Sequence, residues 1–324
     1  MVKTRTNTKR GLASGERWAI VLAGGEGRRL SPLTLLRFGE HRPKQYCAFL
    51  GRRSMFEHTM SRAVSLVGGQ RVVTVIGRGH MRFLDSRESL SGYLVEQPCD
   101  RDTAAGIFLP LTYVLAYDPE ATVAIFPSDH FVNPNLAFLR CMERALELAE
   151  RPSGWVVLAS AVADRPEVEY GWIQSGEPAP EADGLGARRV LQFHEKPDAR
   201  RAAEFLSAGF FWNTFNMAVK AKALWELGRE RQPELVERFE RLRRAIGSAE
   251  EARALAEIYE DMPRVNFSKG LLERCAERTL ALPMTGVQWS DWGRPERIEA
   301  TLASLARPAA AALSPAPAPS LIRA

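Results

Sequence analysis

A glycine-rich segment near the start of the chain has the composition of a phosphate-binding loop. Gly24, Gly25 and Gly27 lie close together, and Arg28 and Arg29 follow them directly. A turn without side chains lets backbone N–H groups approach a polyphosphate, and an arginine at its end adds a fixed fork of donors. A plain tight turn with solvated arginines is the alternative. The glycine spacing matches neither the dinucleotide fingerprint nor the P-loop.

Three charged side chains farther along the chain could complete a phosphate site. Lys44, in the segment RPKQY, offers a mobile cation for a leaving polyphosphate, although a surface lysine is the alternative. Asp129 follows a strand-like run in PSDH, and Asp291 lies in WSDWG. Hard divalent cations prefer oxygen ligands, so the two aspartates predict one metal site; capping or turn aspartates are the alternative. Ser128, Asp129 and His130 are adjacent and cannot form a hydrolase triad, whose members converge from separate elements.

Polar residues in the second half of the chain have the chemistry of a sugar-phosphate site. Glu195 and Lys196 end a strand-like run, so a carboxylate suited to a sugar hydroxyl stands next to a cation suited to a phosphate. A surface ion pair is the alternative for these two. Asn213 can both donate to and accept from vicinal hydroxyls, as a sugar site requires.

The elements that must position these residues alternate in type through the first half of the chain. Strand-like apolar runs alternate with segments that have helical spacing, and a capping box at Ser54 and Glu57 opens the first helix. This rhythm predicts a parallel sheet with helices on both faces. The predicted strands are 18–22, 71–76, 93–95, 122–126 and 155–161, and the predicted helices start at 54 and cover 102–117 and 135–149.

The second half of the chain changes character. Strands are predicted at 170–174, 188–194, 213–220 and 280–284, with mostly helical sequence over 221–278 and a last helix over 295–305. We therefore expect an α/β fold with a Rossmann-like mixed, mostly parallel sheet and flanking helices, plus a smaller, mainly helical C-terminal part. The expected divisions are a flexible basic segment 1–15, a core 16–220, a helical extension 221–306 that returns Asp291 to the site, and a disordered Ala/Pro tail 307–324.

The composition excludes several classes of protein. The four cysteines are scattered without a CxxC pair, which argues against a structural zinc site or a disulfide framework and fits a cytoplasmic location. No apolar run approaches the ~20 residues of a membrane span, and none follows the basic start as a secretory signal requires. The net charge is +5, but basic residues are dispersed among glutamates, so we expect no nucleic-acid partner.

Considered in order, these motifs resemble those of the sugar-1-phosphate nucleotidyltransferases, and in particular the mannose-1-phosphate guanylyltransferase branch. The resemblance implies transfer of a nucleoside monophosphate from an NTP, preferentially GTP, to a hexose 1-phosphate, preferentially mannose 1-phosphate, with release of pyrophosphate. We expect small-molecule partners and no membrane association. The oligomeric state stays open, with a homodimer as one candidate. The matching segments are LAGGEGRRLSPLT, RPKQY, EQPCDRDTAAG, IFPSDH, EYGWI, FHEKPD, FWNTFNMAV and WSDWG, within residues 18–297.

The resemblance also implies roles for individual residues. The catalytic set is Arg29, Lys44 and Asp129. The nucleotide-binding set is Ala23, Gly24, Gly25, Gly27, Arg28, Gln97 and Ser128. The sugar-phosphate set is Gly171, Glu195, Lys196 and Asn213. The expected cofactor is Mg²⁺, held by Asp129 and Asp291.

The chain departs from the family pattern at several positions. Asp102 stands where the family commonly has asparagine, and Thr214 and Phe215 follow the sugar asparagine where a small residue and glycine are common. Residues 35–42 make a longer link to the lysine segment than usual. A related enzyme with another NTP or sugar phosphate, and a non-catalytic nucleotide-sugar-binding regulator, remain alternatives. We expect neither the C-terminal β-helix nor the isomerase domain that many family members carry.

Overall fold

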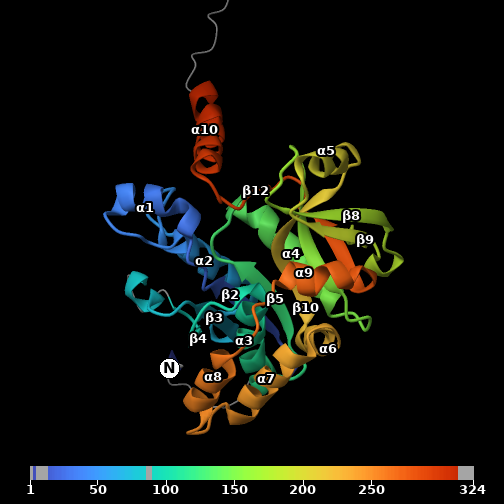
Figure 1. Cartoon of the computed structure of the whole chain (residues 1–324). Coiled ribbons are helices and arrows are strands. Elements are labelled where there is room, and N and C mark those ends of the chain that lie inside the picture. Colours follow the sequence, from blue (N-terminus) through green and yellow to red (C-terminus); the bar gives the residue numbers. More distant parts are fainter. Residues whose placement is uncertain (1–2, 5–13, 85–89, 313–324) are drawn as a thin grey trace, which may run out of the picture.

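The computed structural model describes residues 3–4, 14–84 and 90–312 of the chain. A ten-stranded mixed sheet forms the centre of the fold (Figure 1). Its strand order is β1-β4-β3-β2-β5-β10-β7-β11-β9-β8. The strands are β1 Lys3–Thr4, β2 Arg17–Ala23, β3 Val72–Ile76, β4 Tyr93–Glu96, β5 Thr122–Pro127, β7 Val156–Val162, β8 Gly171–Pro178, β9 Arg188–Glu195, β10 Phe211–Lys220 and β11 Thr279–Pro283. The predicted mixed sheet with flanking helices is confirmed.

Parallel pairing is concentrated in the N-terminal half of the sheet. β2 pairs in parallel with β3 and β5, and β3 pairs in parallel with β4. The residues of β3 and β5 are buried throughout, which explains their continuous apolar sequences. Helices α2 (Met55–Val67) and α4 (Asn135–Ala149) pack into one core cluster, and α3 (Asp102–Tyr117) packs into another. The predicted capping box of α2 is present, with Ser54 and Glu57 bonded reciprocally.

The C-terminal half of the sheet is largely antiparallel. β10 pairs in this sense with β5, β7 and β8, and so joins the two halves. β11 lies between β7 and β9, although it comes after residue 278 in the chain. The division predicted at residue 220 therefore does not separate two structural units, because the segment 221–306 supplies an interior strand of the core sheet.

Helices from the second half cover the face of the sheet on which α3 lies. α6 (Ala221–Arg231), α7 (Pro233–Ala245) and α8 (Glu251–Glu260) pack against one another, and α3 contacts α6 and α7. The short helix α9 (Phe267–Gly270) also contacts α3. Within the described ranges, no helix combines the length and the apolar character needed to cross a bilayer.

Both predicted chain ends need correction. Lys3–Thr4 form β1, which pairs antiparallel with β4, although the segment 1–15 was expected to be flexible. The last helix, α10, spans Pro295–Ala312 and so continues into the predicted Ala/Pro tail. The remainder of that tail, 313–324, lies outside the described residues, as do 1–2 and 5–13. The sequence patterns did not indicate α1 (Ser31–Phe38) or α5 (Ala199–Ser207).

A separate two-stranded ribbon positions the predicted metal ligands. β6 (Phe131–Asn133) and β12 (Gln288–Ser290) pair antiparallel, with Phe131 opposite Ser290. Asp129 precedes β6 and Asp291 directly follows β12. In the register of this antiparallel pair, His130 directly precedes β6 and lies opposite Asp291, and Asp129 is one residue farther along. The ribbon therefore brings together two aspartates that are far apart in the chain.

Candidate active site

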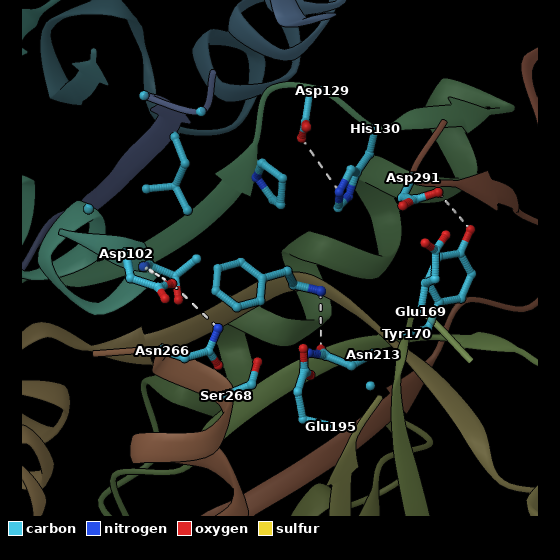
Figure 2. Close-up of a pocket in the computed structure, with 18 of the residues that line it drawn as sticks. Asp102, Asp129, His130, Glu169, Tyr170, Glu195, Asn213, Asn266, Ser268 and Asp291 are labelled. Atoms are coloured by element: carbon cyan, nitrogen blue, oxygen red, sulfur yellow. Dashed lines mark hydrogen bonds and ion pairs between the residues drawn. The ribbon is translucent and has the colours of Figure 1, made fainter. Parts of the chain in front are cut away.

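A cleft of about 490 Å³ opens at the carboxyl ends of β2, β3 and β5 (Figure 2). This edge of an open α/β sheet is where ligands bind in general. The glycine loop after β2 borders the cleft on one side. The residues predicted to bind the sugar phosphate, at β8, β9 and β10, border it on the other. Predicted site residues that line it are Gly24, Gly25, Arg29, Gln97, Asp129, Gly171, Glu195, Lys196, Asn213 and Asp291.

The glycine loop packs closely, so that a side chain on Gly24 would displace Gln97 and one on Gly27 would meet backbone. A Cβ on Gly24 would lie 2.3 Å from Nε2 of Gln97. Gly27 has φ +64°, and a Cβ there would lie 2.9 Å from the backbone nitrogen of Lys44. A Cβ on Gly25, in contrast, would meet no atom of the described residues within 4 Å. The space above Gly25 is therefore available to a ligand.

Two residues that we did not single out from the sequence fix the shape of the loop. Gln45 Nε2 donates to the carbonyl oxygens of Ala23 at 3.0 Å and Gly25 at 2.7 Å. Tyr46 donates its hydroxyl to the same Ala23 oxygen at 3.0 Å. The carbonyls are thus turned inward and satisfied, which leaves the N–H side of the loop for an anion. The adjacency of both residues to Lys44 in RPKQY was the available signal.

The predicted convergence of Lys44 with the two aspartates is present. Lys44 is 5% exposed, and its Nζ lies 3.1 Å from Oδ2 of Asp129. The same nitrogen donates to the backbone carbonyl of Asp291. Figure 2 shows Asp129 and Asp291 at the same end of the cleft, on either side of His130. One lysine therefore links both segments that carry the predicted metal ligands.

Both aspartates are held in the ionised form. Burial alone would raise the pKa of Asp291, but the charges of Lys44 and Arg297 outweigh it and lower the pKa to about 2. Burial is opposed in the same way at Asp129, where Lys44 and then His130 hold the pKa below its ordinary value. The cleft therefore presents two carboxylates ready to accept a cation at neutral pH.

A second group of residues that the sequence patterns did not reveal fixes the orientation of Asp291. Its Oδ1 accepts hydrogen bonds from Tyr170 at 2.8 Å, from the backbone of Gly293 at 2.9 Å and from Arg297 at 2.7 Å. Arg297 also contacts Glu169 at 2.6 Å. These contacts occupy Oδ1 and leave Oδ2 of Asp291 as the oxygen with bonding capacity toward the cleft.

Arg29 lies at the boundary of this network. Its guanidinium is 3.3 Å from Oε1 of Glu169 and 3.9 Å from Oδ2 of Asp291. The Arg29 side chain is 59% exposed, so these ion pairs are screened by water and weak. A polyphosphate entering the cleft can therefore take Arg29 from its carboxylate partners at small cost.

The sugar-type residues form a compact group at the other end of the cleft. A Cβ on Gly171 would lie 2.9 Å from Oε2 of Glu195 and 3.2 Å from Cβ of Asn213, so only glycine permits this approach. Burial raises the pKa of Glu195, although Lys196 at 3.6 Å partly offsets the effect. Ser268, from α9, borders the same group.

Two of the departures noted in the sequence, Asp102 and Phe215, line the cleft, whereas Thr214 is fully buried. Phe215 has φ +61° and sits in a bulge of β10 between Asn213 and Asn216. Its backbone N–H donates to Oδ1 of Asn213 at 3.1 Å, which orients that amide. Asp102 has φ +67°, a conformation that asparagine and aspartate tolerate better than most residues, and its Oδ1 accepts from Asn266 at 3.4 Å.

Some members of the predicted nucleotide-binding set do not line the cleft. Ser128 is fully buried, and its hydroxyl donates to the Leu22 carbonyl at 2.6 Å, so it ties the end of β5 to β2 and is not part of the cleft lining. Ala23 is buried beneath the loop and Gly27 shapes its turn. Arg28 is exposed and outside the cleft lining. These four therefore act on the loop's geometry or lie beside it.

Comparison with known proteins agrees with this geometry. A family model described as nucleotidyl transferase matches residues 18–306, which contain every described cleft residue. The chain belongs to this nucleotidyl transferase family.

Several relatives carry functional names. Alginate biosynthesis protein AlgA of Pseudomonas syringae pv. tomato is 30% identical over 285 residues, covering 85% of this chain and 56% of AlgA. Mannose-1-phosphate guanylyltransferase of Escherichia coli K12 is 26% identical over 291 residues, covering 87% of this chain and 59% of that protein. The chain thus spans a little over half the length of these curated relatives.

Solved structures share the fold. One described as mannose-1-phosphate geranyltransferase from Thermus thermophilus matches with a TM-score of 0.73 at 28% identity, over 86% of this chain and 76% of that chain. A putative glucose-1-phosphate thymidylyltransferase from Bacillus anthracis matches with a TM-score of 0.53 at 17% identity, over 94% of this chain and 98% of that chain. The second likeness is one of fold alone.

Proposed function

We propose that this protein transfers a nucleoside monophosphate from an NTP to a hexose 1-phosphate and releases pyrophosphate. The observation that carries the proposal is one cleft lined by Gly25, Asp129 and Asp291, with the buried Lys44 bonded to both aspartate segments behind its wall. The sugar-type group around Glu195 lines the same cleft. Family membership and the names of the relatives support the same reaction class.

In the proposed reaction, a phosphate oxygen of the sugar phosphate attacks the α-phosphorus of the NTP. The bond from that phosphorus to the bridging oxygen breaks, and pyrophosphate leaves with the electron pair. Phosphoryl transfer of this kind depends on positioning and on neutralising charge. Lys44 and Arg29 stabilise the negative charge that develops on the pyrophosphate, and Lys196 attracts the attacking sugar phosphate.

We propose Mg²⁺ as the cofactor, held by Asp129 and Asp291. Both are oxygen donors whose pKa values lie below the ordinary range, as a hard cation requires. In the described part of the chain, no group of three or more His, Cys, Asp or Glu residues is arranged to hold a metal. Two carboxylates fit Mg²⁺ nonetheless, because this ion commonly completes its shell with water and substrate phosphates. The bound ion would neutralise phosphate charge.

We further propose GTP and mannose 1-phosphate as the substrates, which makes GDP-mannose the product. The names of several relatives support this choice. Gln97 supports guanine, because its Oε1 is buried without a hydrogen-bond partner in the described structure and its side chain lines the cleft. Guanine offers N–H donors on its Watson–Crick edge, which an amide oxygen can accept.

Pyrophosphate release across a matrix of four NTPs and several hexose 1-phosphates, with and without Mg²⁺, tests the proposed function. We expect the highest kcat/KM for GTP with mannose 1-phosphate and no turnover without a divalent cation. A preference for another NTP or sugar would correct the substrates and keep the reaction class. Nucleotide-sugar binding without pyrophosphate release in any combination would support a regulator and overturn the proposal.

A further inference from the structure

A second cavity, of about 300 Å³, shares a wall with the active-site cleft. α2, the start of α4 and the β6–β12 ribbon border it. His130 lines both the cleft and this cavity, and Phe131 and Trp292 line the cavity beside it. His130 follows Asp129 in sequence and Trp292 follows Asp291, so the shared wall is built from the same segments that carry the two catalytic carboxylates.

The cavity contains a buried cation without an anionic partner. Arg62, on α2, is 7% exposed, and its Nε donates to Oδ1 of Asn135 at 2.7 Å. Its Nη2 reaches the Val132 carbonyl at 3.4 Å. Within the described ranges Arg62 forms no ion pair with a carboxylate, and burial lowers its pKa to about 10. A buried charge without a counterion is costly, so an anion placed here would be stabilised.

The rest of the lining is positive or neutral. Arg53 and His58 border the cavity and are exposed to solvent, and no aspartate or glutamate of the described residues borders it. Burial, followed by the charges of Arg62 and Arg53, lowers the pKa of His58. Asn135 adds an amide, while Phe49 and other apolar residues form the remaining surface. The cavity therefore combines two guanidinium groups with an apolar wall.

We propose that this cavity binds a phosphate group, with Arg62 as the buried anchor and Arg53 and His58 as exposed contacts. A guanidinium fork matches phosphate oxygens in geometry and charge. The volume is at the lower end of the range for small-molecule sites, which suits inorganic phosphate, pyrophosphate or a small phosphate monoester.

Calorimetric titration of the full chain with inorganic phosphate, at constant ionic strength and without nucleotide, tests the binding. Arg53→Gln and His58→Gln change exposed side chains and should fold normally; we expect each to weaken binding about threefold. Arg62→Gln should weaken it about tenfold or more, since it removes a desolvated charge contact. Arg52→Gln is the matched control, because Arg52 is an exposed neighbour that borders neither cavity. Arg29→Gln reports on phosphate bound in the cleft.

Unchanged affinity in Arg52→Gln and Arg29→Gln, with loss in the cavity variants, supports the proposal. Absence of phosphate binding by the wild type, equal affinity in Arg53→Gln, His58→Gln and wild type, or loss only in Arg29→Gln would each overturn it. If Arg62→Gln fails to fold, the two exposed variants decide. Parallel titrations with pyrophosphate and a hexose 6-phosphate identify the source of the phosphate group. The assay involves no turnover, so its outcome is independent of the proposed nucleotidyl transfer.

Discussion

At the scale of single residues, the site is organised by cations that are shared among carboxylates. Lys44 contacts both Asp129 and the Asp291 segment, and Arg29 contacts Glu169 and Asp291. These pairs neutralise the acidic groups before any substrate enters. The Lys44 pair is shielded from water and the Arg29 pair is not, so Arg29 is the cation that can move to a triphosphate most easily.

The Gly25→Ala variant should impair NTP binding without changing the stability of the fold. Among the described glycines, Gly25 is unusual because it has neither a positive φ nor a neighbour within 4 Å of an added Cβ. We expect thermal stability within about 1 °C of wild type, since an open-site substitution changes little. The new methyl group would occupy the proposed triphosphate space, so KM for the NTP should rise at least about tenfold, a cost near 1.4 kcal/mol. Initial-rate kinetics and a melting curve measure both, and an unchanged KM would contradict the loop's role.

Glu195→Gln should stabilise the protein at neutral pH while impairing sugar-phosphate binding. The folded-state pKa of Glu195 is raised above its ordinary value of 4.5, mainly by burial. At pH values between the unfolded and the folded pKa, the folded state holds a proton that the unfolded chain has released, so stability falls as pH rises through this range. Removing that penalty should raise Tm by about 1–3 °C at pH 7. The difference should shrink near pH 4; a Tm difference independent of pH would show that the burial penalty is not its cause.

At the scale of elements, two short strands carry the predicted metal ligands. β6 and β12 are each three residues long and, within the described structure, pair only with each other. Stacking of Phe131 on Trp292, with ring centroids 5.0 Å apart, joins the ribbon to a small apolar cluster. Arg297, on α10, then fixes Asp291 from the side. The relative position of the two carboxylates thus depends on the ribbon and one helix.

Arg297→Gln should loosen this arrangement. Arg297 contacts Asp291, Glu167 and Glu169 within 2.8 Å and is 11% exposed, so its loss removes a partner that three largely buried acidic groups share. We expect a loss of about 3 kcal/mol in stability and a higher Mg²⁺ concentration for half-maximal rate.

Arg294→Gln is the matched control for this position. Arg294 pairs with Glu169 and lies next to the same helix but is 57% exposed, so water screens this ion pair and its loss should change the stability little. Denaturant titration and Mg²⁺-dependent kinetics compare the two variants. Equal behaviour of Arg297→Gln and Arg294→Gln would show that Arg297 does not position Asp291.

At the scale of the whole molecule, the site depends on a sheet that includes an interior strand from the C-terminal part of the sequence. β11 lies between β7 and β9, and residues of α6, α7 and α8 share the core cluster of α3. The chain should therefore unfold in one transition in urea, with coincident midpoints by circular dichroism and tryptophan fluorescence. The fragment 1–220 should not fold alone. Two separated transitions would indicate independent domains.

The sequence predicted the buried elements well and the exposed connections poorly. Apolar runs such as 122–126 became fully buried strands, and the capping box at Ser54 marked the start of α2 to the residue. Pairing partners are long-range, so nothing within 279–283 indicated that this strand enters the middle of the sheet. The short helix α1 carries too few buried residues to produce a clear pattern, whereas α5 is strongly amphipathic and has Asp198 as its N-cap, a local signal that we did not use.

The candidate site shows the same division between local chemistry and long-range geometry. Residues whose type reveals their chemistry, such as Asp129 and Lys44, were predicted and meet in space. Supporting residues such as Arg297 and Gln45 act through contacts across the fold, and their types are common on protein surfaces. Ser128 was placed by its motif, but its side chain turns toward β2. Side-chain direction is a property of packing that a motif alone does not encode.

The most direct test of the account is the rate of pyrophosphate release, titrated with Mg²⁺, for wild type, Asp129→Asn and Asp291→Asn. Both substitutions keep the side-chain volume and remove the charge, so circular dichroism should remain as in wild type. We predict that each lowers kcat about 10²–10³-fold, comparable to losing a principal charge-stabilising group. Rates within about threefold of wild type for either variant across the titration would contradict the paired-carboxylate site.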